Sequence, residues 1–284
     1  MARPRGGYIG FNRITTDTAA SGVWTLREAE SQVRAGEWPG AIPLENLQLW
    51  LDGSDANTLF DAASGGSLVA ADGGVARWED KSGNGRHFTQ ATSANRPQRK
   101  VADINGRDCL RFDGNNDILT RTQEAWAHTV PLNFFVVFRA AAFTPAYCAI
   151  WDFYGENSSA TAGNTGLIKS NGKSAVYLTD VLSGQPNYDG TGSVTYSTNT
   201  THLFFVSINN SAISSRGDKS ADGSHTGSWT NRTNLGNDPL KLGASSLFSR
   251  YTDIKMCEFI VYNASLGTQE RALVEDYLTT KWKP

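Results

Sequence analysis

The sequence predicts an all-β fold, a two-sheet antiparallel sandwich of the jelly-roll kind. A long series of short segments with strand-like patterns begins at Leu47, and loops rich in Gly, Ser, Asn and Thr separate them. Residues 132–139 (LNFFVVFR) form a nearly continuous apolar run, which is typical of a strand at the centre of a sheet covered on both faces. Strands at such spacing, with turn signals between them, indicate two packed sheets.

Length and charge set the broad class. The chain has 284 residues, enough for one β-domain of about 240 residues preceded by an arm. Its 26 basic and 28 acidic residues are intermixed and leave a net charge of −2, so no nucleic-acid partner is expected. No apolar window reaches the roughly 18 residues of a membrane span, and the N-terminus lacks the apolar core of a signal peptide. We therefore expect no membrane partner and synthesis in the cytoplasm without a signal peptide.

Residues 1–43 differ from the rest and are expected to form an extended arm for docking or oligomerisation, followed by the sandwich at 44–284. A short helix is expected after Thr25, because Thr25 and Glu28 match a capping box. The arm has too little periodic apolar surface for a core of its own, so its apolar side chains should be buried against this domain, a sister subunit or another protein. These residues are Tyr8, Phe11, Trp24, Leu26, Val33 and Trp38.

The stretch 103–120 (DINGRDCLRFDGNNDILT) is predicted to form a hairpin that sets the register of two strands of the sandwich. An alternating apolar run at 109–112 meets the turn residues 113–117, and a second apolar run follows at Ile118 and Leu119. Further strands are expected at 47–51, 75–79, 132–139, 147–153, 167–169, 175–179, 193–198, 202–208, 212–216, 239–243 and 253–262. Long polar loops are expected at 155–166, 183–192 and 218–237.

One helix is expected to close the chain and to pack on the sandwich. Thr268 is a suitable N-cap, and Leu273, Val274, Tyr277, Leu278 and Trp282 form one apolar stripe at helical spacing. Three cysteines, Cys109, Cys148 and Cys257, each lie in an apolar strand-like run. Their odd number and spacing predict buried free thiols rather than disulfides or a zinc site.

Four segments together carry a family resemblance that covers about residues 44–282. They read LQLWLDGSDANTLFD, VARWEDKSGNGRHFTQ, NGRDCLRFDGNNDIL and EFIVYNASLGTQERALVEDYLTTKW. In combination they resemble the concanavalin A-like lectin/glucanase group, in its laminin-G-like branch found in bacterial and bacteriophage proteins. The resemblance implies a jelly-roll domain that binds carbohydrate or acts as a structural module, and fold alone does not choose between these functions.

The arm carries a resemblance of its own. Residues 21–39 (SGVWTLREAESQVRAGEWP) resemble a short module of structural proteins of tailed bacteriophages. This implies a virion protein that displays the sandwich as a tail-fibre or receptor-contacting module or as a capsid decoration. Residues 1–43 would bind other virion proteins, a glycan of the host surface would be the ligand, and a homo-oligomer such as a trimer is expected. A stand-alone lectin is the alternative, followed by a glycosidase.

The chain lacks the carboxylate pattern of a glucanase, so it is expected not to be an enzyme. A retaining glycosidase needs two carboxylates about 5–5.5 Å apart on one groove, and no Glu-x-Asp-x-x-Glu run occurs. Glu79 and Asp80 are adjacent in a strand-like run, so their side chains should point to opposite faces. The four histidines are dispersed along the sequence.

No cofactor is expected, with calcium as the alternative. Asp113, Asn115 and Asp117 offer hard oxygen ligands, but Asp and Asn at these spacings also cap turns through their own backbone. Residues 78–85 are likewise expected to form a strand and turn, with an internal Asp80–Lys81 or Asp80–Ser82 contact.

Glycan binding would need exposed aromatic rings beside polar groups. Trp151, Tyr154, Tyr188 and Trp229 are the predicted binding residues, because they lie in or beside the long polar loops. Tyr196 belongs to the same set of aromatic candidates.

Overall fold

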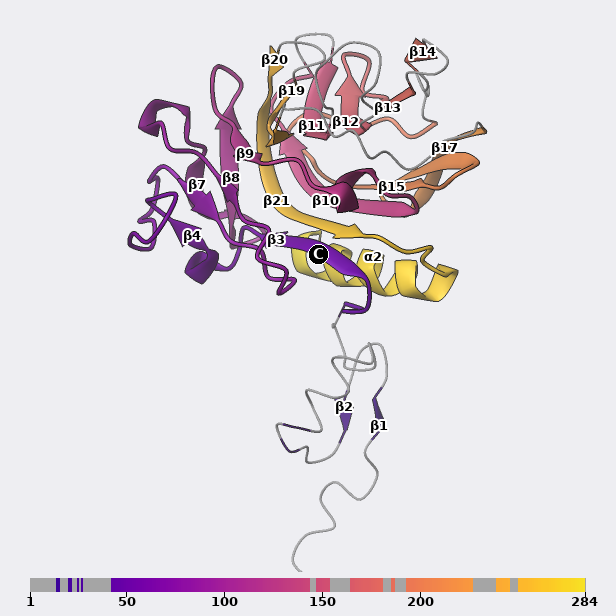
Figure 1. The fold of residues 1–284 in the computed structure, drawn as a ribbon, viewed down its shortest axis with the longest axis horizontal. Helices are drawn as coiled ribbons and strands as arrows, with labels where there is room; N and C mark the ends of the chain where they lie inside the picture. The colour runs from indigo at the N-terminus through magenta and orange to yellow at the C-terminus, as the bar shows by residue number, and fades with distance from the viewer. Residues whose placement is uncertain are drawn as a thin grey trace, which may run out of the picture.

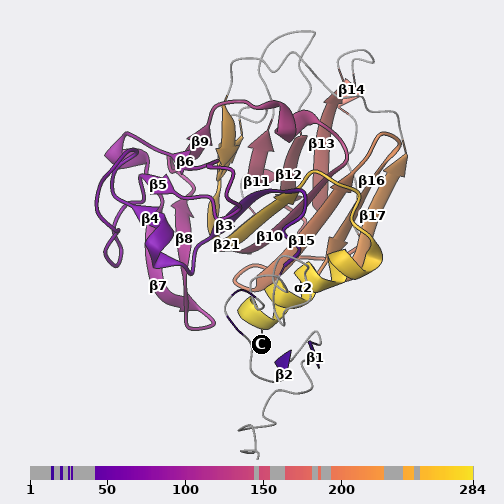
Figure 2. The same cartoon turned by 60° about the horizontal axis from the view of Figure 1, so that its bottom comes forward.

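The computed structural model confirms the predicted fold class. It describes residues 14–15, 20–21, 25, 27, 42–143, 147–153, 164–180, 185–186, 193–226, 239–245 and 250–283. Within these residues two large antiparallel sheets pack face to face, and one α-helix, α2 (Thr268–Trp282), lies against the outer face of one sheet (Figures 1 and 2). No helix in this part of the chain is long and apolar enough to cross a membrane.

The first sheet has eight strands in the described part of the chain, in the order β17-β16-β15-β10-β21-β8-β7, with β3 also paired to β21. Its strands are β3 (Leu47–Asp52), β7 (Gln98–Ile104), β8 (Arg107–Asp113), β10 (Leu132–Ala140), β15 (Thr201–Ile208), β16 (Ala212–Gly217), β17 (Ser220–Thr226) and β21 (Asp253–Tyr262).

The second sheet has nine strands in the same described residues, in the order β14-β13-β12-β11-β18-β9-β6-β5-β4. They are β4 (Leu59–Phe60), β5 (Arg77–Trp78), β6 (Phe88–Thr89), β9 (Leu119–Arg121), β11 (Tyr147–Phe153), β12 (Asn164–Lys169), β13 (Ser174–Asp180), β14 (Gln185–Pro186) and β18 (Leu240–Leu242). Short pairs and 3-10 turns complete the structure: β1 (Ile14–Thr15) with β2 (Ala20–Ser21), β19 (Ala244–Ser245) with β20 (Arg250–Tyr251), η1 (Ala56–Thr58), η2 (Ser93–Asn95) and η3 (Ala125–His128).

Strands β10 and β21 form the middle of the first sheet. Strand β10 pairs with β15 on one side and β21 on the other, and it is buried along nearly its whole length, as its apolar run predicts. The first part of β21 pairs with β8 and its second part with β3. The side chains of β10 alternate between two cores. Phe134 and Val136 pack between the sheets, whereas Phe135 and Val137 pack with Val274 of α2.

The predicted hairpin at 103–120 is wrong. Its two strands belong to different sheets, because β8 pairs with β21 and β7, whereas β9 pairs with β18 and β6. The turn at 113–117 therefore carries the chain from one layer of the sandwich to the other. The hairpin in this stretch is β7–β8, where Asn105 and Gly106 both have positive φ, at 50° and 66°. Asn-Gly favours such a tight turn, and Ile104 pairs with Arg107 across it.

Two other expectations differ at the edge of the first sheet. Residues 193–198 form no strand, and β17 lies within the expected loop 218–237. Strand β17 (SADGSHT) has no apolar alternation because it is an outer strand in which Asp222 is the buried polar residue. The three cysteines are buried and free, as predicted, and burial raises the pKa of each thiol.

The N-cap of helix α2 lies one residue earlier than expected, so the helix begins at Thr268 itself. Gly267 is the N-cap, and its backbone N–H donates to the Glu270 carboxylate at 2.7 Å. Val274, Leu278 and Trp282 of the predicted stripe are buried against the first sheet. The helix therefore covers the outer face of that sheet, next to β10 and β15 (Figure 2).

Candidate functional site

A buried carboxylate joins helix α2 to the first sheet. Glu258 of β21 is fully buried, and its two carboxylate oxygens accept four hydrogen bonds. The indole N–H of Trp50 and the hydroxyl of Tyr277 donate to Oε1 at 2.7 and 2.9 Å. Lys281 Nζ and the Trp282 indole N–H donate to Oε2 at 2.8 and 2.7 Å. The end of α2 is thus fixed to β21 and β3 through one side chain.

Two lysines extend this cluster, which we call the Glu258 network. Lys281 also reaches Asp52 Oδ1 at 2.7 Å, and Lys81 bridges Asp52 and Asp55 at 2.8 and 3.0 Å. Burial, together with the charge of Asp52, raises the pKa of Glu258 in spite of Lys281. Burial also acts to raise the pKa of Asp52, but Lys281 and Lys81 outweigh it and lower that pKa.

Three of the four segments that carry the family resemblance meet in this network. Trp50 and Asp52 come from LQLWLDGSD, Lys81 from WEDKSG, and Glu258 and Lys281 from the last segment. Four donors already occupy the Glu258 carboxylate, so it has little capacity left to bind a ligand. The sequence signal for Glu258 was a single acidic residue inside an apolar strand. We infer that these motifs have a structural role, because their side chains hold helix α2 against the first sheet.

The turn after β5 has a structural role rather than a binding role, as predicted. The Asp80 carboxylate accepts from the backbone N–H of Trp50, Ser82 and Arg86 at 3.0, 2.9 and 2.9 Å. The Ser82 hydroxyl donates to it as well, at 2.8 Å. These bonds hold the turn against β3.

Trp151 does not fit its predicted role as a sugar-binding platform. It is 0% exposed, its ring stacks on Phe134 with centroids 5.0 Å apart, and its indole N–H donates to Asn164 Oδ1 at 2.8 Å. Tyr196 is only 2% exposed. The prediction rested on the position of Trp151 beside a polar loop. In the structure β11 lies between β12 and β18 in the second sheet, and the Trp151 side chain packs in the core.

Most of the other predicted residues lie outside the described residues, so their roles stay predictions. Of the binding set these are Tyr154, Tyr188 and Trp229. Of the arm they are Tyr8, Phe11, Trp24, Leu26, Val33 and Trp38.

The candidate calcium ligands serve the turn that connects the two sheets. Asp113 Oδ1 accepts the backbone N–H of Asn115, Asn116 and Asp117 at 2.9, 3.2 and 3.3 Å. Asp117 Oδ2 in turn accepts the N–H of Asp113 at 2.9 Å. Within the described residues no group of three or more His, Cys, Asp or Glu side chains is arranged to hold a metal ion.

This turn lines a polar depression, which we call the Asp117 depression. It has a volume of about 320 Å³, and Ser93, Gln98, Arg111 and Asp117 contribute to its wall. Burial raises the pKa of Asp117 to about 6, and the nearby charge of Asp113 adds to this shift, although the Asp113 N–H and Arg111 oppose it. For Asp113, burial is outweighed by the three N–H donors, and the pKa is lowered.

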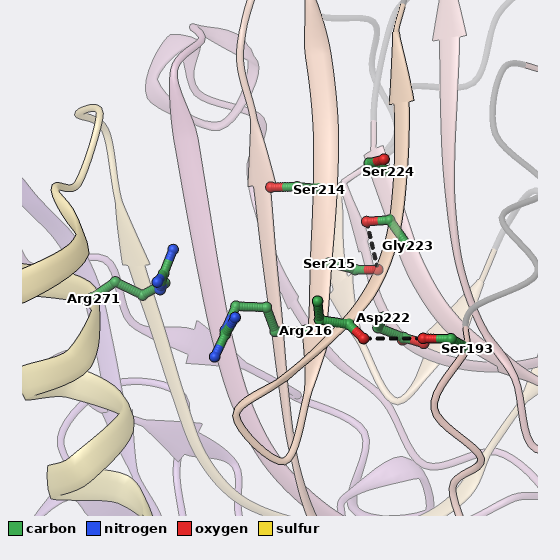
Figure 3. A pocket seen from close by; sticks show the side chains of 9 residues that line it. Ser193, Ser214, Ser215, Arg216, Asp222, Gly223, Ser224 and Arg271 are labelled. Atoms are coloured by element: carbon green, nitrogen blue, oxygen red, sulfur yellow. Dashed lines mark hydrogen bonds between the residues drawn. The ribbon is translucent and has the colours of Figure 1, made fainter.

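A larger depression lies near the opposite end of the first sheet, over β16 and β17 beside the start of α2 (Figure 3). We call it the serine–arginine depression, and its volume is about 400 Å³. Its wall is formed by Ser193, Ser214, Ser215, Arg216, Ala221, Asp222, Gly223, Ser224 and Arg271. Figure 3 shows that strands β16 and β17 supply Ser214, Ser215, Ser224 and Arg216, whereas Arg271 comes from the helix and Ser193 lies outside these strands.

Some of the serine hydroxyls in this depression form hydrogen bonds within the protein and others do not. Ser193 donates to the Ala221 carbonyl at 3.0 Å and Ser215 to the Gly223 carbonyl at 3.5 Å. Ser214 and Ser224 are exposed, and their hydroxyls have no hydrogen-bond partner within the described part of the chain. They are available to donate to and accept from a bound hydroxyl compound.

Comparison with known proteins adds information on the fold. No family model and no curated protein matches the chain. The Trypanosoma rangeli sialidase structure is similar, with a TM-score of 0.53 and 11% identity over 90% of this chain and 37% of that chain. The binding domain of Paraclostridial Mosquitocidal Protein 1 has a TM-score of 0.53 and 12% identity over 84% of this chain and 53% of that one. The chain thus spans between about a third and a half of these proteins, and the likeness shows a shared fold.

The prediction that the chain is not an enzyme is contradicted by this comparison. Structures of a sialidase, including one described as a covalent intermediate, contain the same fold. The prediction rested on a missing pair of carboxylates, but sialidases use a tyrosine nucleophile and are an exception to the two-carboxylate rule. The absence of one glucanase motif therefore does not exclude enzymatic activity in this fold.

Removing the Glu258 carboxylate should destabilise the fold strongly. We expect Glu258→Ala to lower the free energy of unfolding by about 3–5 kcal/mol, because it leaves buried donors and Lys281 without their main partner. Urea denaturation followed by tryptophan fluorescence measures this. As a control, Lys100→Ala removes a lysine whose partner Asp72 is 71% exposed, and a loss of only about 0–1 kcal/mol is expected. Equal losses in the two variants would contradict the role assigned to the network.

Replacing Asp117 should stabilise the protein at neutral pH. Its pKa is higher in the folded chain than in the unfolded one, so its stabilising contribution is present at low pH and is lost as the pH rises from about 4 through 6. Asp117→Asn keeps an oxygen acceptor and removes the charge. We expect a gain of about 1–2 kcal/mol at pH 8, after allowance for solvent screening, and none at pH 4.

The neighbouring carboxylate provides a control of opposite sign. The pKa of Asp113 is lowered on folding, so its contribution is present above pH 4 and is lost as the pH falls. Asp113→Asn should therefore destabilise the protein at pH 8 and have little effect at pH 3. Urea denaturation across this pH range compares the two variants, and a loss of stability in Asp117→Asn at pH 8 would refute the assignment.

Proposed function

We propose that the chain is a glycan-binding β-sandwich module whose ligand occupies the serine–arginine depression. The observation that carries the proposal is a depression of about 400 Å³ lined by exposed serine hydroxyls and two guanidinium groups. This volume lies within the range of small-molecule sites, and sugars are recognised through hydrogen bonds to their hydroxyl groups. A helix and two paired strands position these groups, which gives the site a rigid frame.

The Asp117 depression is a weaker candidate because its polar groups already serve the protein. The guanidinium of Arg96 donates to the carbonyls of Gln90, Asp61 and Ala91 at 3.1, 3.0 and 2.7 Å. Asp113 and Asp117 close the turn between the sheets. Few of its hydrogen-bonding groups therefore remain for a sugar.

Two further observations support glycan binding. One similar structure is named a binding domain, and sialidase structures with this fold contain bound sialic acid or inhibitors. In addition, Tyr188 and Trp229 belong to the segments that directly precede Ser193 and follow β17 in sequence. These two aromatic residues remain our predicted sugar-stacking groups.

We propose in addition that the module is carried on a bacteriophage particle, as a tail-fibre or receptor-contacting module or as a capsid decoration. Support comes from the resemblance of residues 21–39 to a phage structural module. In this proposal residues 1–43 bind other virion proteins or sister subunits, a trimer being one such oligomer, and a host surface glycan is the ligand.

Filling the serine–arginine depression should weaken glycan binding. Ser214 is exposed on β16, so Ser214→Trp should place a bulky ring in the depression without disturbing the core. We expect the variant to lose at least tenfold in affinity for any glycan that the wild-type chain retains on a glycan array. Released monosaccharide is measured in the same samples, so that turnover of the glycan is also detected.

The matched control places the same side chain in the other depression. Ser93 is exposed on η2 and lines the Asp117 depression, and Ser93→Trp should leave binding unchanged. Loss of binding in Ser93→Trp together with normal binding in Ser214→Trp would contradict the proposed site.

Removing the arm should prevent attachment to the particle and leave the folding of the sandwich unchanged. The deletion should end at residue 41, because Ile42 is 2% exposed in the core under α2 and the Pro43 carbonyl accepts from Tyr262 at 2.8 Å. We expect the shortened chain to fold and to bind glycan as before but to be absent from purified particles. Full incorporation of the shortened chain, measured by quantitative immunoblotting, would refute docking through the arm.

A further inference from the structure

Two guanidinium groups share one buried carboxylate beside the serine–arginine depression. Glu275 of α2 is 2% exposed, and Arg216 Nε of β16 donates to its Oε1 at 2.8 Å. Arg271 Nε lies 4.0 Å from the same oxygen. One carboxylate therefore faces two cations, and one positive charge remains at the edge of the depression.

The two arginines are held very differently. Arg216 is fixed on two sides, because Nε donates to Glu275 and Nη2 donates to the carbonyl of Lys219. Arg271 Nε is buried and, within the described residues, has no hydrogen-bond partner, although its side chain is 26% exposed. The Arg271 guanidinium also lies over the Phe205 ring, 5.9 Å from the ring centroid. Its two Nη nitrogens have no hydrogen-bond partner in the described part of the chain, so these, rather than the buried Nε, are available to a ligand.

We propose that the serine–arginine depression binds an acidic saccharide and that Arg271 receives its anionic group. This inference rests on the proposed glycan-binding function. A planar guanidinium presents parallel N–H groups that match the oxygens of a carboxylate or a sulfate. Ser214 and Ser224 stand on the neighbouring strands, where they meet the hydroxyl groups of the same sugar (Figure 3).

Three acidic residues lie near the depression, and their charges are compensated to different extents. The Asp222 carboxylate accepts from the backbone N–H of Val194 at 2.7 Å and from the Ser174 hydroxyl, so the protein's own donors satisfy it. Asp276 is paired with Lys219. Glu270 accepts from Gly267 at the helix start, where it partly offsets the positive potential of the first turn.

The test compares lactose with two matched acidic forms, 3′-sialyllactose and lactose 3′-sulfate, by isothermal titration of the full chain. We expect the acidic forms to bind roughly tenfold to a hundredfold more tightly than lactose, as for a hydrogen bond to a charged group. Arg271→Gln should remove this difference, and Arg271→Lys, which keeps the charge but loses the planar fork, should retain part of it. Comparison of the carboxylated and sulfated forms identifies the preferred anion.

Controls distinguish the possible failures. Arg111→Gln removes the same charge from the Asp117 depression and should leave the preference intact, and circular dichroism of each variant verifies folding. If the wild-type chain binds neutral and acidic forms equally, or if Arg271→Gln keeps the preference, the acidic-sugar inference is wrong while glycan binding stands. If no neutral or acidic glycan binds on a broad array, the proposed function fails with it.

Discussion

The buried carboxylate of Glu258 is the constraint on which the outer layer of the molecule depends. A charged group in a protein interior is tolerated only when its hydrogen-bonding capacity is filled, and here two indoles, a phenol and an ammonium fill it. Three of these four donors come from the last turns of α2. The network therefore selects one position of the helix on the sheet, in addition to the apolar contacts of Val274 and Leu278.

The position of the helix in turn creates the candidate site. Arg271 and Lys281 are ten residues apart on α2, about 15 Å along a helix axis. With the Lys281 end fixed by Glu258 and Asp52, the opposite end brings Arg271 and Glu275 beside Arg216 of β16. The motifs that resemble a known family thus fix the helix on the sheet. The serines and arginines that line the depression lie on these elements but belong to no recognisable motif.

The predictable parts of the fold are the elements whose hydrophobic pattern is complete within one short segment of the sequence. The apolar run of β10, the bounds of β11 and β21, and the stripe of α2 follow directly from periodicity. The hairpin prediction at 113–117 failed because periodicity does not indicate which sheet a strand joins. The Asn105-Gly106 pair contained the correct hairpin signal in the same stretch.

The candidate site was not predictable in the same way. Ser214, Ser224 and Arg271 come from three elements and form no motif, and β17 was itself expected to be a loop. The importance of Arg271 depends on the burial of Glu275 and on its contact with Arg216, which only tertiary structure shows. The aromatic ring of Trp151 beside a polar loop suggests sugar stacking, yet the same ring fills the core between the sheets.

The position of a bound saccharide in a crystal structure of the full chain tests the central claim most directly. The ligand should lie over β16 and β17, with anionic oxygens within hydrogen-bond distance of the Arg271 guanidinium and sugar hydroxyls near Ser214 and Ser224. A saccharide bound against Gln98 and Asp117 at the other end of the sheet, with the serine–arginine depression holding only water, would contradict it.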